Sequence, residues 1–282
     1  MVPSAAVAPE STSDGARRRR LFWRFAPAAL LLLVAAWQAA AVSCAPTRVP
    51  SDEDWERAAS FVRERHQPDE LIVFAPGWLD PVGRLHLGDR IPVGMAARMD
   101  AARYAAIWEL ATRGARASEV RGLEPSSEAR FGRLRVRRYE QRPVEVVTDF
   151  AARLPSAVIS GGFAKRPRRV LEEVGFTPRH CVLAVPRPGE QGHVRFDEVD
   201  LGDELVGYVG LADIFTRRDI REPGALRVLI DGEQVAAIEP GIDDGWVRFA
   251  ATTESRAGAT VEFLASAEAP DRRICFAAEA RR

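Results

Sequence analysis

The side chains best suited to chemistry lie in ELIVFAPGWLDPVGRLHLGD, which runs from Glu70 to Asp89. Carboxylates and guanidinium groups hydrogen-bond to hydroxyl groups and anions, and an indole face packs on the apolar side of a sugar ring. All of these groups occur together in the second half of the stretch, at Trp78, Asp80, Arg84, His86 and Asp89. The stretch therefore predicts a binding site for an anionic or sugar-like group.

The same residues also fit an ordinary structural role. Asp80-Pro81 and Gly88-Asp89 are common turn dipeptides, and Arg84 is near enough in sequence to pair with either aspartate. An enzyme that cleaves glycosidic bonds needs two carboxylates about 5 to 10 Å apart. Asp80 and Asp89 are the nearby pair that the sequence offers for such an enzyme. The structural role is the favoured interpretation of this stretch; of the two functional roles, binding is favoured, catalysis is the alternative, and no catalytic residue is assigned.

Other motifs for catalysis are not found in the sequence. It has no glycine-rich phosphate loop and no nucleophile elbow. Its 3 cysteines and 4 histidines lack the spacing of metal ligands, so we expect no metal and no cofactor. Positive and negative side chains cancel at 40 each, which argues against nucleic acid as a partner.

The elements that must position the first candidate site flank it in sequence. Residues 71–75 form a continuous apolar run, which is typical of a strand covered on both faces in a parallel sheet. A capping box that starts at Ser51 begins an amphipathic helix before this strand. Further apolar stretches predict strands at 104–111 and 131–139. Together these elements predict a small α/β, Rossmann-like domain over residues 50–142, with the site beyond the carboxyl end of its first strand.

This predicted domain resembles part of a known group of enzymes. The resemblance rests on DWERAASFVRER, PDELIVFAPGWLDPVGRLHLGD, IWELATRGARA and FGRLRVRRYE, and it covers about residues 50–142. These stretches are similar to the extracytoplasmic C-terminal region of bacterial polyprenyl-phosphate-dependent glycosyltransferases of the dolichyl-phosphate-mannose mannosyltransferase kind. The multi-span catalytic part of those enzymes has no counterpart here. The resemblance therefore implies their scaffold and partnership with such a membrane glycosyltransferase, rather than their catalytic centre.

The C-terminal part, residues 178–282, has the pattern of an all-β domain. Short apolar or alternating stretches separated by turn residues predict an antiparallel β-sandwich. Asp231-Gly232 is a strong hairpin signal. The order of the stretches resembles the jelly-roll modules related to galactose-binding and carbohydrate-binding domains. The fold class expected for the whole chain is therefore α+β.

Trp246 is the candidate binding residue of this second domain. An aromatic face and polar groups at Tyr208, Asp213 and Arg217 are the residue types that sugar sites use. Trp246 also stands at the start of a strand pattern whose other face carries Phe249, so packing is the alternative role. The sequence leaves both roles open.

Residues 143–177 separate the two predicted domains. They contain clustered glycine and proline and a basic run from Lys165 to Arg169, with poor periodicity. This composition predicts a solvated linker.

The N-terminal segment has the pattern of a membrane anchor. Residues 1–20 predict a disordered cytoplasmic tail that ends in four arginines, and residues 21–43 predict a transmembrane helix. Arginines before the apolar run and acids after it place the N-terminus in the cytoplasm and the body outside the bacterial inner membrane. A lipoprotein anchored through an acylated Cys44 is the alternative.

The remaining two cysteines lie in the part of the chain that this topology exports. Cys181 and Cys275 would form a disulfide or stay as two thiols, and their spacing does not decide between these states. The function expected from all these features is a membrane-tethered extracytoplasmic binding or scaffolding protein of the bacterial cell envelope, associated with glycans or lipid-linked sugars. An extracytoplasmic carbohydrate-active enzyme that uses acids of residues 77–90 is the alternative.

Overall fold

The computed structural model describes residues 13–44, 49–212 and 222–282. The chain divides into two compact units, Met1–Ser51 and Asp52–Arg282, each of which is described by itself.

The first unit consists of one helix, α1 (Ser13–Cys44), with Pro27 inside it. Residues 13–20, which the sequence predicts as disordered, are helical, while residues 1–12 lie outside the described part. Leu30, Leu33 and Trp37 are exposed large apolar side chains of this helix. Within the described residues, no helix combines the length and the apolar character needed to cross a membrane, so the transmembrane helix expected over 21–43 is not confirmed.

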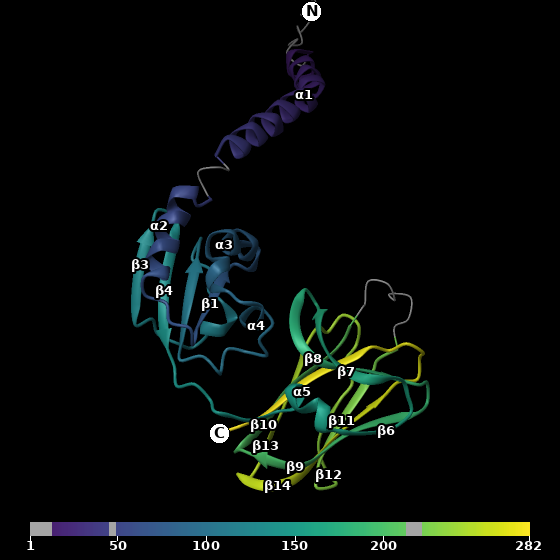
Figure 1. Ribbon diagram of the computed structural model, residues 1–282. Coiled ribbons are helices and arrows are strands. Elements are labelled where there is room, and N and C mark those ends of the chain that lie inside the picture. The colour runs from purple at the N-terminus through teal and green to yellow at the C-terminus, as the bar shows by residue number, and fades with distance from the viewer. Residues whose placement is uncertain (1–12, 45–48, 213–221) are drawn as a thin grey trace, which may run out of the picture. The chain divides into compact units, whose positions relative to one another are not determined.

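The second unit begins with a small α/β part. Helix α2 (Asp52–Arg63) precedes a four-stranded sheet with the order β1-β2-β4-β3. The strands are β1 (Glu70–Ala75), β2 (Ala106–Ala111), β3 (Ser127–Phe131) and β4 (Leu134–Glu140). In Figure 1, α2 and α3 (Asp80–Leu87) accompany this sheet, and the contacts place α2 against β3 and β4 and α3 against β1.

The predicted strand over 71–75 is confirmed, but the Rossmann-like prediction is not. Only the pair β1 and β2 is parallel, whereas β4 is antiparallel to β2 and to β3. The reason is a hairpin between β3 and β4, whose turn contains Gly132 at a φ of 51°. A Cβ atom at Gly132 would lie 2.1 Å from Asp54 Oδ1, so this tight turn against α2 requires glycine.

Residues 77–90, expected as a loop, are almost entirely helical. They form η2 (Gly77–Leu79), α3 and η3 (Gly88–Arg90), and α4 (Val93–Ala96) follows. Gly83 allows α3 to approach the sheet closely, because a Cβ there would lie 2.1 Å from the Phe74 ring. A further short helix, η4 (Ser118–Val120), follows β2.

Two buried glutamates stabilise this sheet through hydrogen bonds. Glu109 on β2 is fully buried and accepts hydrogen bonds from Arg137 Nη1 at 3.0 Å and the Tyr139 hydroxyl at 3.1 Å. Glu70 on β1 accepts hydrogen bonds from Trp108 Nε1 at 2.6 Å and Arg138 Nη2 at 2.6 Å. Burial alone would raise the pKa of Glu70, but these hydrogen bonds and one from a backbone N–H outweigh it and lower the pKa.

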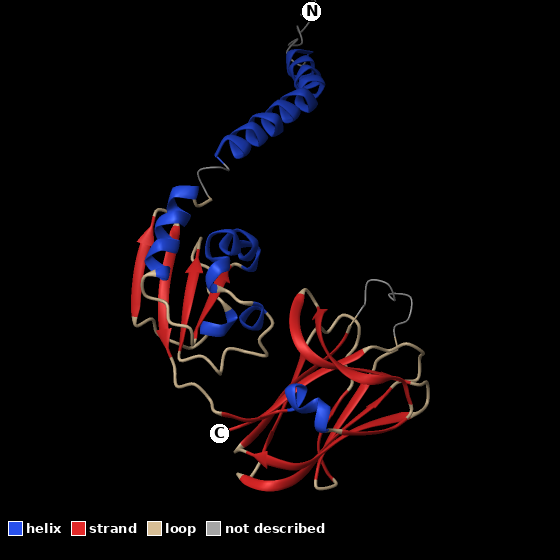
Figure 2. Ribbon diagram, viewed as in Figure 1, coloured by secondary structure: helices blue, strands red, loops and turns tan. Residues whose placement is uncertain are grey.

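The rest of the second unit is a β-sandwich, shown in Figure 2 as strand with a short helix. One sheet has the order β13-β10-β15-β8-β7 with β5 beside β15, and the other has the order β12-β11-β14-β9-β6. The elements before β9 are β5 (Val146–Asp149), α5 (Phe150–Arg153), η5 (Leu154–Ser156), β6 (Val158–Gly161), β7 (Phe163–Val174) and β8 (Thr177–Pro186). Those that follow are β9 (Gln191–Leu201), β10 (Glu204–Leu211), β11 (Ala225–Ile230), β12 (Glu233–Ile238), β13 (Val247–Thr252), β14 (Arg256–Ser266) and β15 (Ile274–Arg281).

The predicted antiparallel sandwich is confirmed. The described strand pairs of both sheets are antiparallel, and from β8 to β11 successive strands alternate between the sheets, as in jelly-roll folds. The predicted hairpin joins β11 to β12, with Asp231 at a φ of 50° and Gly232 at 84°. These two positive φ values are those of a type I′ turn.

The segment 143–177 belongs to the sandwich and is not a linker. It carries β5, β6 and β7, which pair with β15, β9 and β8 respectively. Its glycines and prolines mark turns and irregularities within paired strands: Gly161 has a φ of 82°, and the β7 register shifts between Lys165 and Arg168, where Pro167 lies. These breaks hide the strand pattern in the sequence.

The sandwich core lies between its two sheets and contains a cluster of phenylalanines. Phe263 contacts Phe150, Phe196 and Phe276, with ring centroids 4.8 to 5.9 Å apart. On the outer face of the β15 sheet, Cys181 of β8 and Cys275 of β15 form a disulfide across 94 residues. The pairing that the sequence left open is therefore present.

We expect loss of this disulfide to weaken the fold. Closing a loop of this length restricts the unfolded chain, so a Cys181→Ala/Cys275→Ala variant should lose about 2 to 5 kcal/mol of unfolding free energy. Urea denaturation followed by tryptophan fluorescence measures the loss. Dithiothreitol should lower the wild-type midpoint and leave that of the double variant unchanged; equal midpoints for both proteins would contradict the expectation.

We expect Glu70 to stabilise the fold above the pKa of an unfolded glutamate, which is about 4.3. Its folded pKa is lowered, so the contribution is present at neutral pH and is lost as the pH falls through the folded value. Glu70→Gln should therefore cost about 1 to 3 kcal/mol at pH 7, and less near pH 3. Glu140→Gln is the matched control, because Glu140 also bonds Arg138 but its side chain is 66% exposed. A pH-independent difference for Glu70→Gln would exclude this role.

Candidate functional site

The two aspartates of the first candidate site pair with different arginines. Asp80 pairs with Arg84 one turn along α3, with Arg84 Nε 2.5 Å from Oδ2. Asp89 instead pairs with Arg63 of α2, whose Nη2 lies 3.0 Å from Oδ1. Hydrogen bonding to Arg63 lowers the pKa of Asp89.

His86 and Trp78 also have structural neighbours. The His86 ring stacks on Trp55 at 5.6 Å with an interplanar angle of 4°. Trp78 is 52% exposed, and the guanidinium of Arg113 lies 5.6 Å from its ring centre. Each of the five predicted residues thus has a structural neighbour, and Asp80 and Asp89 pair with different arginines.

Trp246 is anchored by the fold. Its Nε1 donates a hydrogen bond to the Thr177 carbonyl oxygen at 2.8 Å, and it lies against the outer face of the β15 sheet. The Arg179 guanidinium lies 5.1 Å from its ring centre. Trp246 therefore holds an arginine, a role that neither sequence interpretation included. Asp213 and Arg217, expected to act with it, lie outside the described residues.

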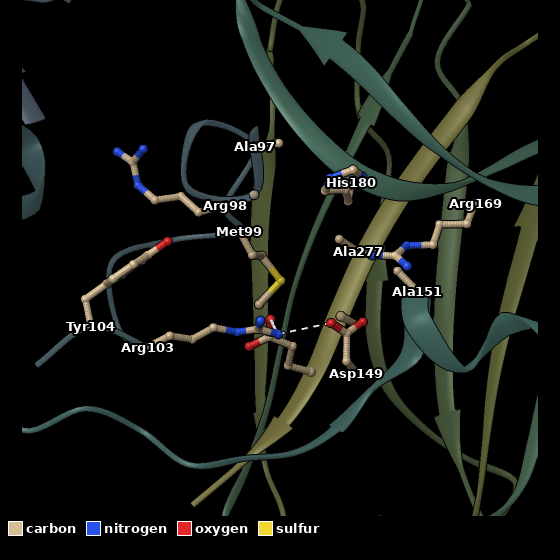
Figure 3. Close-up of a pocket in the computed structure, with 13 residues that line it drawn as sticks. Ala97, Arg98, Met99, Arg103, Tyr104, Asp149, Ala151, Arg169, His180 and Ala277 are labelled. Carbon is tan, nitrogen blue, oxygen red and sulfur yellow. Dashed lines mark hydrogen bonds and ion pairs between the residues drawn. The ribbon is translucent and has the colours of Figure 1, made fainter. Parts of the chain in front are cut away.

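A different site forms where the segment after α4 meets the sandwich. Two adjoining cavities of about 550 and 240 Å³ share Arg98 and Met99 in their walls, and we call them together the cleft. Side chains of Arg98, Asp100, Glu119 and Gln141 line the larger cavity from the α/β part, and Arg179 and Tyr208 line it from β8 and β10. Figure 3 shows the smaller cavity, with Arg103 and Met99 facing Asp149 and Ala277.

A network of ion pairs holds the walls of the cleft. Arg281 on β15 binds Asp100 through two hydrogen bonds of 2.9 and 3.1 Å and binds Glu279 at 2.8 Å. Arg103 bonds the same Glu279 and also Asp149, the latter at 3.1 Å. Burial alone would lower the pKa of Arg281, but its hydrogen bonds and the charge of Glu279 outweigh burial and raise it.

The carboxylates of the cleft are all engaged by arginine. Besides those already described, Glu119 pairs with Arg98 at 2.5 Å. Burial of Glu119 acts to raise its pKa, but the Arg98 charge and further hydrogen bonds lower it overall. A general acid needs a raised pKa, and the pKa of Glu119 is lowered instead.

Arg179 differs from the other arginines of the cleft. Its guanidinium lies 3.8 Å from the ring centre of Tyr208. Its buried Nε and Nη1 have no hydrogen-bond partner among the described residues. Burial lowers its pKa to about 10, while Tyr208 and Asp100 oppose that change. Arg179 is therefore still a cation at neutral pH.

Sequence patterns did not indicate this site. Arg179 stands beside His180 at the start of β8 and has no motif around it. Asp100 and Arg281, which bond each other, are 181 residues apart in sequence. Arginine is the cation favoured in buried ion pairs, but this preference does not tell which carboxylate an arginine will bind.

Comparisons with known proteins give similarities of fold only. No protein-family profile and no curated protein matches the sequence, so the resemblance to glycosyltransferases has no support from these comparisons. A CBM51 module from Clostridium perfringens in complex with methyl-galactose is similar over 47% of this chain and 98% of its own, with 10% identity and a TM-score of 0.36.

Two other solved carbohydrate-binding modules show the same level of similarity. A xylan-binding CBM22 domain from Paenibacillus barcinonensis matches 43% of this chain and 84% of its own, with 15% identity and a TM-score of 0.29. A CBM61 module in complex with β-1,4-galactotriose matches 49% of this chain and 96% of its own, with 13% identity and a TM-score of 0.31. These values are too low to assign a family or a ligand.

We expect the buried network to fail when its central cation is removed. Arg281→Met leaves Glu279 and Asp100 short of a partner, and Glu279 is only 3% exposed. Breaking a buried pair from one side costs about 3 to 5 kcal/mol, measurable by urea denaturation. The neighbouring Arg282→Met is the control, because the Arg282–Glu145 pair is exposed and its loss should barely move the midpoint. Equal effects of the two variants would show that the network is dispensable.

Proposed function

We propose that this protein is a noncatalytic glycan-binding protein whose ligand occupies the cleft. The observation that carries the proposal is the cleft wall itself: a cavity of about 550 Å³ lined by arginine, carboxylate, amide and tyrosine side chains. Its volume lies within the usual range of about 300 to 1,000 Å³ for small-ligand sites.

The chemistry of these walls suits sugar hydroxyl groups. Carboxylates that are held by arginine on one side still have lone pairs for hydroxyl donors, and arginine N–H groups donate to hydroxyl oxygens. Because the ion pairs already fix these side chains, little side-chain entropy is lost on binding. The same ion pairs leave no carboxylate in the described part of the cleft suited to proton transfer, which favours binding over catalysis.

We further propose that α1 tethers the protein to the bacterial cytoplasmic membrane, with the second unit outside. Four arginines precede an apolar run in the sequence, and Leu30, Leu31, Leu32 and Leu33 of α1 are exposed. The Cys181–Cys275 disulfide supports an oxidising compartment. Acylation of Cys44 is the alternative attachment, and a membrane glycosyltransferase of the cell envelope is the proposed neighbour.

The tether has a simple test. Full-length protein expressed in a Gram-negative bacterium should sediment with membranes and resist extraction by carbonate at high pH, whereas a chain that begins at residue 49 should not. Protease added to spheroplasts should digest the second unit. Retention in the soluble fraction, or protection of the second unit in intact spheroplasts, would exclude this arrangement.

Filling the larger cavity should abolish glycan binding. Ser118 is an exposed residue of its wall, so Ser118→Trp should obstruct the cavity and lower affinity at least tenfold on a glycan array. Ser127→Trp is the matched control, because Ser127 is exposed on the edge strand β3 and lines no cavity described here. Glycan binding that survives Ser118→Trp but is lost with Trp78→Ala would move the site to α3, and no binding by the wild type would end the proposal.

A further inference from the structure

Of the described charged side chains that line the larger cavity, Arg179 alone bonds no opposite charge. Arg98, Arg103 and Arg281 each bond a carboxylate, whereas Arg179 bonds none among the described residues. Buried charges in folded proteins are almost always paired, because an uncompensated charge loses its hydration without replacement. Arg179 lines a cavity and has no carboxylate partner, so an anion bound in that cavity would compensate its charge.

The protein has no carboxylate ready to supply that partner. Asp100 is close enough to affect the pKa of Arg179, but both of its oxygens are held by Arg281. Glu119 is held by Arg98. The anion that completes the site must therefore come from outside the described part of the chain.

The aromatic residues prepare Arg179 for such a partner. Tyr208 and Trp246 contact the guanidinium through their ring faces, at 3.8 and 5.1 Å from the ring centres. Ring faces attract the positive charge, and a hydrogen bond with Tyr208 also favours the charged form, but Nε and Nη1 stay without a hydrogen-bond partner among the described residues. Arg179 also forms part of the wall of the larger cavity, so a ligand in that cavity would lie beside this arginine.

We propose that the ligand of the cleft is an acidic glycan, and that Arg179 binds its carboxylate. The inference rests on the proposed glycan-binding function and adds the class of sugar. A planar carboxylate matches the planar guanidinium fork with two parallel hydrogen bonds. It also carries a single negative charge, which equals the one unpaired cation of the larger cavity.

The decisive ligands are oligosaccharides of galacturonate, glucuronate and mannuronate, each compared with its methyl ester. Esterification removes the charge and keeps the sugar rings. The full-length protein in detergent should bind at least one acid form about 10 to 100 times more tightly than its ester in isothermal titration calorimetry, the range expected for a charge-assisted hydrogen bond of about 1.5 to 3 kcal/mol. Sulfated oligosaccharides that are otherwise identical in their free hydroxyl groups form a third set of ligands. If the protein prefers them to the uronates, the assignment of a carboxylate is overturned.

Arg179→Met supplies the matched protein variant. It should abolish the preference for acid over ester, and in the absence of ligand it should keep or raise the thermal midpoint, because it removes a buried cation without a partner. Arg98→Met, which removes a cation that has a partner, should lower the midpoint. A variant that keeps the acid preference, or one that unfolds, would refute the assigned role of Arg179.

The outcomes separate this inference from the proposed function. Equal affinity for acids and esters, with both lost in Ser118→Trp, would overturn the acidic class and leave a binding site for neutral glycans in the cleft. Failure of the folded protein to bind any acidic or neutral glycan would overturn both proposals.

Discussion

The need to pair buried charges governs how this molecule is built. Arg281 lies on the last described strand, and its partner Asp100 lies in the segment that leads into β2. Removing such groups from water is favourable only when each finds an opposite charge with good geometry. Arg281 and Arg103 together bond Asp100, Glu279 and Asp149, so the α/β part and the sandwich share one set of compensated charges. The cleft exists because these pairs fix its walls.

The features that could be predicted from sequence are those that depend on neighbouring residues. The buried strand β1 follows from a continuous apolar run, and the hairpin at Asp231-Gly232 follows from the two positive φ values that this dipeptide accepts. The mixture of parallel and antiparallel pairs in the first sheet could not be predicted, because the direction of a strand depends on the path of the chain that connects it to β2. The β7 strand was missed because its register shift interrupts the alternation of apolar and polar residues on which strand prediction depends.

The candidate site was predictable to a smaller extent. Asp80 and Asp89 were predicted as candidate binding groups, and in the structure they pair separately with Arg84 and Arg63. Trp246 does not line the cleft, but it lies against Arg179, which does. Arg179 carries no local signal, since its significance comes from a missing partner. An absence of this kind becomes visible only when the distances between distant segments are known.

The position of β15 has a consequence for how the protein is made. This strand follows every other strand of its sheet in chain order, yet it lies between β10 and β8 and also pairs with β5. While the chain is still emerging from the ribosome, β8 and β10 have no common neighbour to join them, so the sheet stays open until residues 274–281 have been synthesised. Closure of this sheet therefore waits for residues 274–281, and until they arrive β8 and β10 each keep one edge without a partner strand.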